Sequence, residues 1–384
     1  MGIQNESILG TQGAVQSLLS NDTANARGLP GHAFTSPEFF EQEQHRLFRS
    51  TWTCVGFAQD VPDVGDIAPL TFAGLPLFLL RDKNHQVRVF HNVCPHRGMR
   101  VAPKAAKGQK SIQCPYHCWT YDFDGKLIRR LYFGGPEDRG DVCANAELPS
   151  LKEVRSARWL DAVFVNIDGN APPFTDYAAD FLAVAALYGD MSAAEPCGRL
   201  DYEIAANWKL VTENFVDSYH VHWVHPDLQS STPMTSYTHE HRGNVCIGRA
   251  PIRNENPGYG LSTLPSWTGI DAETENVLTY IVLFPNLLLT FTSTRYSLFH
   301  LNPLSPDRTS ERINLYMPNA TDPALESDRQ GFLRAYAELN EEDIWIVEDL
   351  QTSRHSPAFD GGRFSPHWDT LSHHFARLVA NALQ

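Results

Sequence analysis

The sequence predicts an α+β protein, with a small all-β domain followed by a larger domain of strands and long helices. Three observations support this. Short apolar or alternating runs bounded by turn residues fill residues 52–167. A Pro-rich stretch at 171–174 then reads as a linker. Beyond it, strand-like runs are followed by long helical patterns up to residue 384, which is typical of an α+β domain. We therefore divide the chain into domains at 52–167 and 168–384.

Two segments precede the first domain. Residues 1–34 are polar and rich in Gly, Ala, Ser and Asn, and we expect a flexible arm there. Thr35 and Glu38 have the spacing of a capping box, and Pro37 suits a first helical turn. The sequence thus predicts a helix from about 37 to 49. We assign 35–51 to an N-terminal helix that packs on the second domain.

Paired strands account for most of the first domain. The runs 77–80 and 87–93 are separated by a polar turn at 82–85. The runs 119–123 and 126–128 flank Asp124-Gly125, a strong hairpin signal. A last strand is expected at 162–167, ending at Asp168-Gly169.

The second domain is expected to contain both helices and strands. We expect a helix over 208–223 and strands over 277–289, 295–301 and 311–317. Helices are expected over 324–351 and 371–383, so that the long helices follow the strands.

Composition excludes several classes of protein. Asp and Glu number 45 against 31 Lys and Arg, giving a net charge of −14, which argues against a nucleic-acid-binding surface and weakly against anionic membranes. No apolar run reaches the length of a membrane span, and the N-terminus carries no secretory signal. Seven scattered cysteines do not form a disulfide framework. The expected compartment is the cytoplasm, where grouped cysteines more often bind metal.

The first group of ligand-type residues comprises Cys94, His96, Cys114 and His117. The spacing is C-x-H, seventeen residues, then C-x-x-H, and each half follows a strand-like run. Two loops that each supply one thiolate and one imidazole can hold a two-iron cluster, with cysteines on one iron and histidines on the other. The alternative is a Cys₂His₂ zinc site, although C-x-H is tighter than the usual zinc pairs. Cys118 lies outside the pattern and is interpreted as a packed thiol.

The second group lies in 207–226. On a helix, Asp217 and His220 share a face. Because His225 precedes a proline, we expect the helix to end near Trp223 and His225 to turn back toward His220. Two histidines and one carboxylate form the facial triad of non-haem iron enzymes. The third ligand must be a distant carboxylate, and five acids are candidates: Glu341, Glu342, Asp343, Glu348 and Asp349.

From about residue 35 onward the chain resembles the α subunit of the Rieske non-haem iron oxygenases, the aromatic-ring-hydroxylating dioxygenase family. The first group matches its Rieske [2Fe–2S] motif. The pattern D-x-Y-H-x₄-H matches at Asp217, Tyr219, His220 and His225. The resemblance implies a helix-grip catalytic domain with an antiparallel sheet around the iron pocket.

The resemblance also implies roles for individual residues. His220, His225 and Asp343 would hold one mononuclear Fe(II), with Glu342 as the main alternative to Asp343. Glu348 and Gln351 fit the family pattern that follows the Asp ligand. Asp217 would be the bridge that passes electrons from the cluster of one subunit to the iron of the next. We interpret His222 as a packing or supporting residue.

The implied function is that of a terminal oxygenase component. It would use O₂ and electrons from NAD(P)H, delivered by a reductase and possibly a ferredoxin, to hydroxylate, dihydroxylate or demethylate a small organic substrate. An aromatic compound is the first expectation, and a choline- or betaine-like quaternary ammonium compound is the alternative. A homotrimer, or an α₃β₃ complex, is expected. Two other classes remain: a Rieske electron-transfer protein without oxygenase activity and a zinc-stabilised binding protein.

Overall fold

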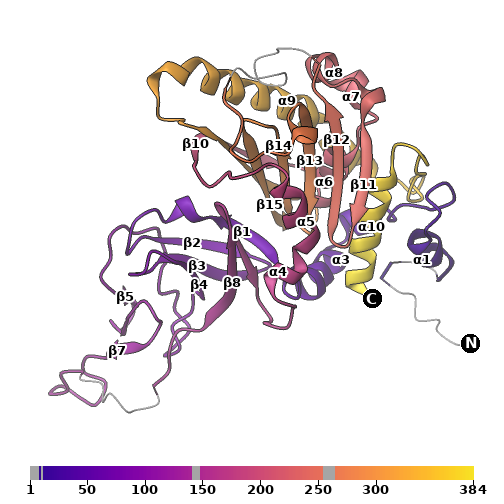
Figure 1. The fold of residues 1–384 in the computed structure, drawn as a ribbon. Coiled ribbons are helices and arrows are strands. Elements are labelled where there is room, and N and C mark those ends of the chain that lie inside the picture. Colours follow the sequence, from indigo (N-terminus) through magenta and orange to yellow (C-terminus); the bar gives the residue numbers. More distant parts are fainter. Residues whose placement is uncertain (1–7, 10–11, 141–147, 254–263) are drawn as a thin grey trace, which may run out of the picture. The chain divides into compact units, whose positions relative to one another are not determined.

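The computed structural model describes residues 8–9, 12–140, 148–253 and 264–384, which form two compact units. One unit is Phe48–Ala171; the other combines Met1–Leu47 with Pro172–Gln384. The predicted class, α+β with antiparallel sheets, is confirmed (Figure 1). No helix among the described residues is long and apolar enough to cross a bilayer.

Two antiparallel sheets build the described part of the unit Phe48–Ala171, residues 48–140 and 148–171. Within it, the larger sheet has six strands and the smaller has three. In spatial order the larger sheet contains β1 (Thr53–Phe57), β9 (Ala162–Asn166), β8 (Glu153–Trp159), β4 (Val87–His91), β3 (Leu75–Arg81) and β2 (Ile67–Phe72). The smaller contains β5 (Ile112–Gln113), β6 (Thr120–Tyr121) and β7 (Leu127–Arg129).

The core of this unit reaches the two cysteine loops. Phe78 and Phe90 stack at 5.4 Å between β3 and β4, and Cys94 and Cys114 belong to the same buried cluster. Because both cysteines are anchored in this core, the loops that carry them start from rigid positions.

A seven-stranded antiparallel sheet is the centre of the other unit. Its spatial order is β10 (Ala194–Ile204), β16 (Arg308–Pro318), β15 (Tyr296–Ser305), β14 (Leu287–Phe291), β13 (Val277–Leu283), β12 (Val245–Pro251) and β11 (Thr238–Arg242). Three helices, α6 (Trp208–Val216), α9 (Glu326–Ser353) and α10 (Thr370–Leu383), pack on the sheet, and α6 contacts both of the others (Figure 1).

Two elements of this unit differ from the sequence prediction. The expected strand 277–289 is a hairpin, because the chain turns at residues 284–286 between β13 and β14. The expected helix 208–223 stops at Val216, since Asp217 takes an extended backbone conformation. Two short helices follow, α7 (Val221–Val224) and α8 (Pro226–Ser231).

The N-terminal segment also differs from expectation. Of the arm expected at 1–34, residues 1–7 and 10–11 lie outside the described residues, while the remainder includes α1 (Gln12–Leu19) and the start of α2 (His32–Thr35). Leu18 is buried where α1 packs on α10, and Leu29, which follows α1, is buried as well. Ser36, rather than Thr35, caps α3 (Pro37–Gln42): its hydroxyl accepts the Phe39 N–H at 3.1 Å, and Thr35 ends α2. A π-helical turn over Glu43–Phe48 continues α3.

A buried ion pair ties this segment to α6. Lys209 Nζ donates to Glu43 Oε1 at 2.7 Å, and both side chains are fully buried. The ammonium also lies 5.2–5.4 Å from the ring centres of Phe34, Phe39 and Trp208. Burial raises the pKa of Glu43 and lowers that of Lys209, so each charge is tolerated only beside the other.

We expect Lys209→Met to destabilise the protein by about 3–5 kcal/mol, because it leaves the Glu43 carboxyl buried without its partner. The double variant Glu43→Leu/Lys209→Met should recover much of the loss. Urea unfolding followed by circular dichroism measures both. A loss below about 1 kcal/mol for Lys209→Met would show that the ion pair is not a stabilising element.

A second prediction concerns acid stability. The rings of His241 on β11 and His374 on α10 stack at 4.2 Å, and His374 Nε2 donates to the Gly243 carbonyl. The pKa of His374 is lowered from 6.5 to about 4. Burial is the larger cause, and the neighbouring His241 is the next. The unfolded chain therefore binds more protons, and stability should fall as pH drops from about 6.5 to 4. His374→Gln should flatten this part of the curve of unfolding free energy against pH; an unchanged slope contradicts the assignment.

Candidate metal centres

The two cysteine loops of the unit Phe48–Ala171 have matching backbones. In each, the cysteine N–H donates to the carbonyl five residues later, at 2.8 Å for both Cys94 and Cys114. The residue four positions on donates to the cysteine carbonyl, at 2.9 Å from Gly98 and 3.0 Å from Cys118. Both of those residues have positive φ, 77° and 55°. The loops are therefore two copies of one turn, and each presents a thiol and an imidazole.

The four ligand-type side chains divide into an inner and an outer pair. The Cys94 and Cys114 thiols are buried and contact each other. The rings of His96 and His117 are half-buried and lie 4.6 Å apart. A pair of thiols and a pair of imidazoles suit a two-iron cluster with one pair on each iron. A single zinc ion would need all four around one point, and among the described residues only a different group converges in that way.

Cys118 differs from the prediction of a packed thiol. It is exposed and has a left-handed backbone, the conformation that Gly98 takes in the other loop. The turn itself, and not the packing of a thiol, decides the geometry at this position, because the left-handed region favours glycine.

The second site begins where α6 ends. Asp217 Oδ1 accepts the Tyr219 N–H at 2.6 Å, a local turn that breaks the helix. The chain then passes through α7 and turns again before Pro226, which starts α8. These two breaks bring His220 and His225 together, with their Nε2 atoms 3.1 Å apart.

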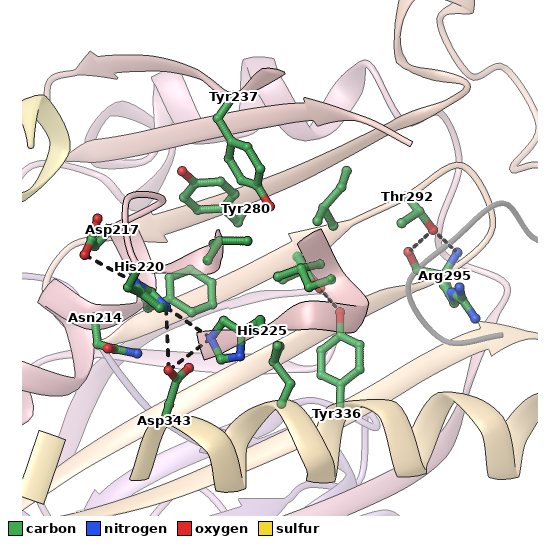
Figure 2. A pocket seen from close by; sticks show the side chains of 16 residues that line it. Asn214, Asp217, His220, His225, Tyr237, Tyr280, Thr292, Arg295, Tyr336 and Asp343 are labelled. Atoms are coloured by element: carbon green, nitrogen blue, oxygen red, sulfur yellow. Dashed lines mark hydrogen bonds and ion pairs between the residues drawn. The ribbon is translucent and has the colours of Figure 1, made fainter. Parts of the chain in front are cut away.

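Asp343, from α9, completes this group (Figure 2). Its Oδ1 lies 3.1 Å from His225 Nε2 and 3.5 Å from His220 Nε2, and the same oxygen is buried without a hydrogen-bond donor. The three ligand atoms lie within 4.8 Å of one another. Two imidazole nitrogens and one carboxylate oxygen are a donor set for a divalent transition metal. Three donors of this kind leave other coordination positions open. The residues present therefore fit a mononuclear iron.

Two further carboxylates orient the histidines. Asp217 Oδ2 lies 3.3 Å from His220 Nδ1, and Glu342 Oε2 lies 2.7 Å from His225 Nδ1. A carboxylate that accepts the Nδ1 proton leaves the Nε2 lone pair free to bind metal. Burial lowers the pKa of His225, but Asp343 and Glu342 outweigh burial and raise it overall.

Glu342, the alternative to Asp343 in the sequence, thus contacts the outer nitrogen of His225 and not the converging atoms. The sequence offered Glu342 as an acid beside Asp343 but no signal for which histidine it touches. His222 is exposed, with its ring against Trp223, and it lies outside the group.

The C-terminal half of α9 clamps the start of α6. The Glu348 carboxylate accepts the Ala205 N–H at 2.9 Å, and the Gln351 side chain accepts the Asn207 N–H at 3.0 Å. Asn207 and Gln351 both donate side-chain N–H groups to the Phe34 carbonyl, at 3.2 and 3.0 Å. These contacts fix α9 along the axis of α6, and therefore fix Asp343 relative to the two histidines.

A cavity of about 100 Å³ adjoins the three converging residues (Figure 2). Its wall includes Tyr237, Tyr280 and Tyr336, with Arg295 on the side away from the histidines. Tyr280 lies across Gly248 on the neighbouring strand: a Cβ at that glycine would sit 1.9 Å from the ring. The Tyr280 ring can therefore take this position only because residue 248 has no side chain.

The fold and the two sites together define a Rieske-type oxygenase. Residues 51–131 match the family model of the Rieske [2Fe–2S] domain, and residues 191–384 match that of the ring-hydroxylating α subunit, catalytic domain. The chain belongs to the ring-hydroxylating α-subunit family. It is an oxidoreductase, the terminal oxygenase component, with a [2Fe–2S] cluster and a non-haem iron as cofactors, and the family acts with O₂ and a reductase.

Proteins similar to this one align with it over nearly its whole length. The carnitine monooxygenase oxygenase subunit of Acinetobacter pittii is 26% identical, over 91% of each chain. The chloroplastic choline monooxygenase of Atriplex hortensis is 24% identical, over 90% of this chain and 76% of the other. The crystal structure of a quaternary ammonium Rieske monooxygenase has the same fold, with a TM-score of 0.79 and 23% identity over 96% of this chain and 98% of the other.

We expect Asp217→Ala to retain both metals and to lose coupled turnover, because the change removes the carboxylate on His220 Nδ1 but none of the converging atoms. Iron content and the absorption spectrum of the cluster measure retention, and product formed per NADH measures coupling. Asp227→Ala, an exposed acid on α8, is the matched control. Unchanged coupling in Asp217→Ala would exclude a bridging role.

Proposed function

We propose that this protein is a monooxygenase of a small quaternary ammonium compound. The observation that carries the proposal is the similarity to a carnitine monooxygenase subunit over 91% of both chains, so that both domains are compared together. The choline monooxygenase has the same chemical class of substrate in its name. The expectation of an aromatic substrate remains a prediction that the same experiment tests.

The aromatic wall of the cavity supports this substrate class. A quaternary ammonium group carries no N–H, so it is recognised by ring faces and not by hydrogen bonds. Tyr237, Tyr280 and Tyr336 all line the cavity beside the converging histidines. Burial raises the pKa of Tyr237 to about 12, so its ring stays a neutral phenol at physiological pH.

In this proposal Cys94, His96, Cys114 and His117 hold the cluster, and His220, His225 and Asp343 hold the iron. When bound, these groups supply single electrons and the activation of O₂. The chain's own residues hold the ligands in place: Asp217 and Glu342 keep the Nδ1 protons of the two histidines. The cavity wall then positions the substrate against the metal-binding side.

We further propose that a reductase supplies electrons from NADH or NADPH, with or without a ferredoxin, and that the chain works in the cytoplasm as a homotrimer or an α₃β₃ complex. Asp217 would link a cluster histidine of a neighbouring subunit to His220 by hydrogen bonds, so that the electron passes along this path without reducing the carboxylate. Tyr219, beside it, is 49% exposed and stacks on Trp368, and Trp223 is 76% exposed. Exposed aromatic side chains next to the bridging carboxylate suit a protein that docks there.

The other two classes have less support. A pure electron carrier needs only the cysteine loops and gives no reason for His220, His225 and Asp343 to converge. A zinc-stabilised binding protein would need one ion among four residues that instead form separate thiol and imidazole pairs.

The test is a substrate screen with purified protein and a reductase, following O₂-dependent NADH consumption and identifying products. Choline, glycine betaine and carnitine represent the proposed class; benzoate and anthranilate represent aromatic acids. We expect an oxidised ammonium product and a red-brown protein whose reduced form gives a Rieske-type EPR signal. If only the aromatic acids give a product, the proposed quaternary ammonium substrate is wrong and an aromatic substrate takes its place. If the purified protein is colourless, the proposal of an oxygenase is wrong. Light scattering of the same sample measures the oligomeric state.

A further inference from the structure

Three residues lie in register across the edge of the seven-stranded sheet. His239 on β11 pairs with Gly248 on β12, and Gly248 pairs with Tyr280 on β13. Directly opposed residues of antiparallel strands share one face of the sheet, so no side chain stands between His239 and Tyr280. Because β11 is the last strand of the sheet and Tyr280 lines the cavity, this row runs from the sheet edge to the cavity wall.

The missing side chain at position 248 decides where the Tyr280 hydroxyl lies. A Cβ at that glycine would sit 2.2 Å from the phenol oxygen, so the hydroxyl extends over β12 in the direction of β11. Tyr280 is 6% exposed, and its hydroxyl meets no hydrogen-bond partner at ordinary geometry among the described residues. A buried hydroxyl without a partner destabilises the fold, which points to a role for this one in the reaction.

Ser218 connects the two ends of the row. Its Oγ lies 2.9 Å from His239 Nε2, and its side chain is buried. Burial raises the pKa of Tyr280 well above its ordinary value, and the adjacent Ser218 hydroxyl lowers that pKa as a hydrogen-bond partner does. The contact between the two hydroxyls is nevertheless looser than an ordinary hydrogen bond. Hydroxyl groups both donate and accept, so Ser218 and Tyr280 are able to pass a proton along.

The reaction of an oxygenase needs a supply of protons. Monooxygenation takes one substrate C–H bond, O₂, two electrons and two protons, and gives C–OH and water. Dihydroxylation of an aromatic ring also takes two electrons and two protons, and leaves both oxygen atoms in the product. The cavity measures about 100 Å³, so a bound substrate displaces its water. Protons then need a route through the protein wall.

We infer that His239, Ser218 and Tyr280 form a proton path from the edge of the sheet to the cavity. Protonated His239 gives its Nε2 proton to Ser218 Oγ, Ser218 passes its own hydroxyl proton to Tyr280, and Tyr280 releases its proton to an acceptor in the cavity. Each hydroxyl breaks one O–H bond and forms another, so both are unchanged and one proton has crossed. His239, which is half-buried, takes the next proton from water. The path serves any oxygenation and does not depend on the quaternary ammonium substrate.

The groups around His239 suit this task. Burial lowers the pKa of His239 and the ring of His367 lowers it further, whereas the His367 backbone and Asp217 raise it. The net result is a pKa below the ordinary value of 6.5. His239 is therefore neutral for most of the time at physiological pH, and its protonated form is acidic enough to give the proton up.

The first test needs no turnover. The full chain is prepared with zinc in place of the mononuclear iron and with ¹³C at the Cζ atom of tyrosine, and Tyr280→Phe identifies the NMR signal of Tyr280. We expect that signal to shift with the same midpoint pH as the His239 imidazole, and the shift to disappear in Ser218→Ala. A Tyr280 signal that ignores the protonation of His239, or that still follows it in Ser218→Ala, overturns the path.

The second test is turnover of the holoenzyme with whichever compound of the substrate screen gives a product. Tyr280→Phe, Ser218→Ala and His239→Ala should each lower kcat by about tenfold or more and leave the iron content unchanged. Added imidazole should restore His239→Ala but not Ser218→Ala, because it replaces only the missing ring. The matched control is Tyr188→Phe, which removes a buried tyrosine hydroxyl that donates to Thr279 outside the row. Its kcat should not change.

Each outcome decides the inference. A kcat within twofold of the unmodified enzyme in Ser218→Ala overturns the path, and so does imidazole that fails to restore His239→Ala. If His239→Ala does not fold, Ser218→Ala decides by kcat, since it removes a single oxygen atom. If no compound of the screen gives a product, the proposed function fails, and the NMR experiment still decides the proton path.

Discussion

The position of α9 relative to α6 determines how the three ligand side chains of the mononuclear site converge. His220 and His225 follow α6, whereas Asp343 lies more than 100 residues later on α9, so no local rule brings them together. The clamp of Glu348 and Gln351 on the start of α6 does so, through backbone N–H groups that any residue except proline would supply. Two hydrogen bonds one turn apart on α9 restrict both its sliding and its rotation relative to the start of α6. The ligand geometry is therefore set at the far end of the helix pair, where no metal binds.

The two metal centres position their ligand side chains in different ways. The cysteine loops repeat one turn, and the thiols are placed by the core beneath them. The histidines and Asp343 are placed by breaks in helices, and each histidine needs its own carboxylate to fix the ring. The first arrangement is rigid in its backbone and the second in its side-chain contacts. Hence the cluster loops depend on the core packed beneath them, while the mononuclear site depends on a network of acids.

Sequence reasoning found the ligand types because their spacing is local. C-x-H and C-x-x-H lie within single turns, and D-x-Y-H-x₄-H lies within one broken helix. It also placed β9, α9 and α10 close to their bounds. It missed the end of α6 at Val216, because the side chain of Asp217 competes with the helix for the Tyr219 N–H and a periodic pattern does not register that competition. It also left open whether Glu342 or Asp343 converges, since two neighbouring acids on a helix differ only in direction, and direction depends on the partner helix.

The glycine at position 248 has a further consequence, for the evolution of this cavity. The Tyr280 ring occupies the space that a Cβ at position 248 would need, so a larger residue at 248 requires the ring to move or to become smaller. The constraint acts in one direction, because a smaller residue at 280 is compatible with Gly248. Directed evolution that samples single substitutions at 248 should therefore fail while Tyr280 is present. The same substitutions should be accepted in a library that also varies position 280.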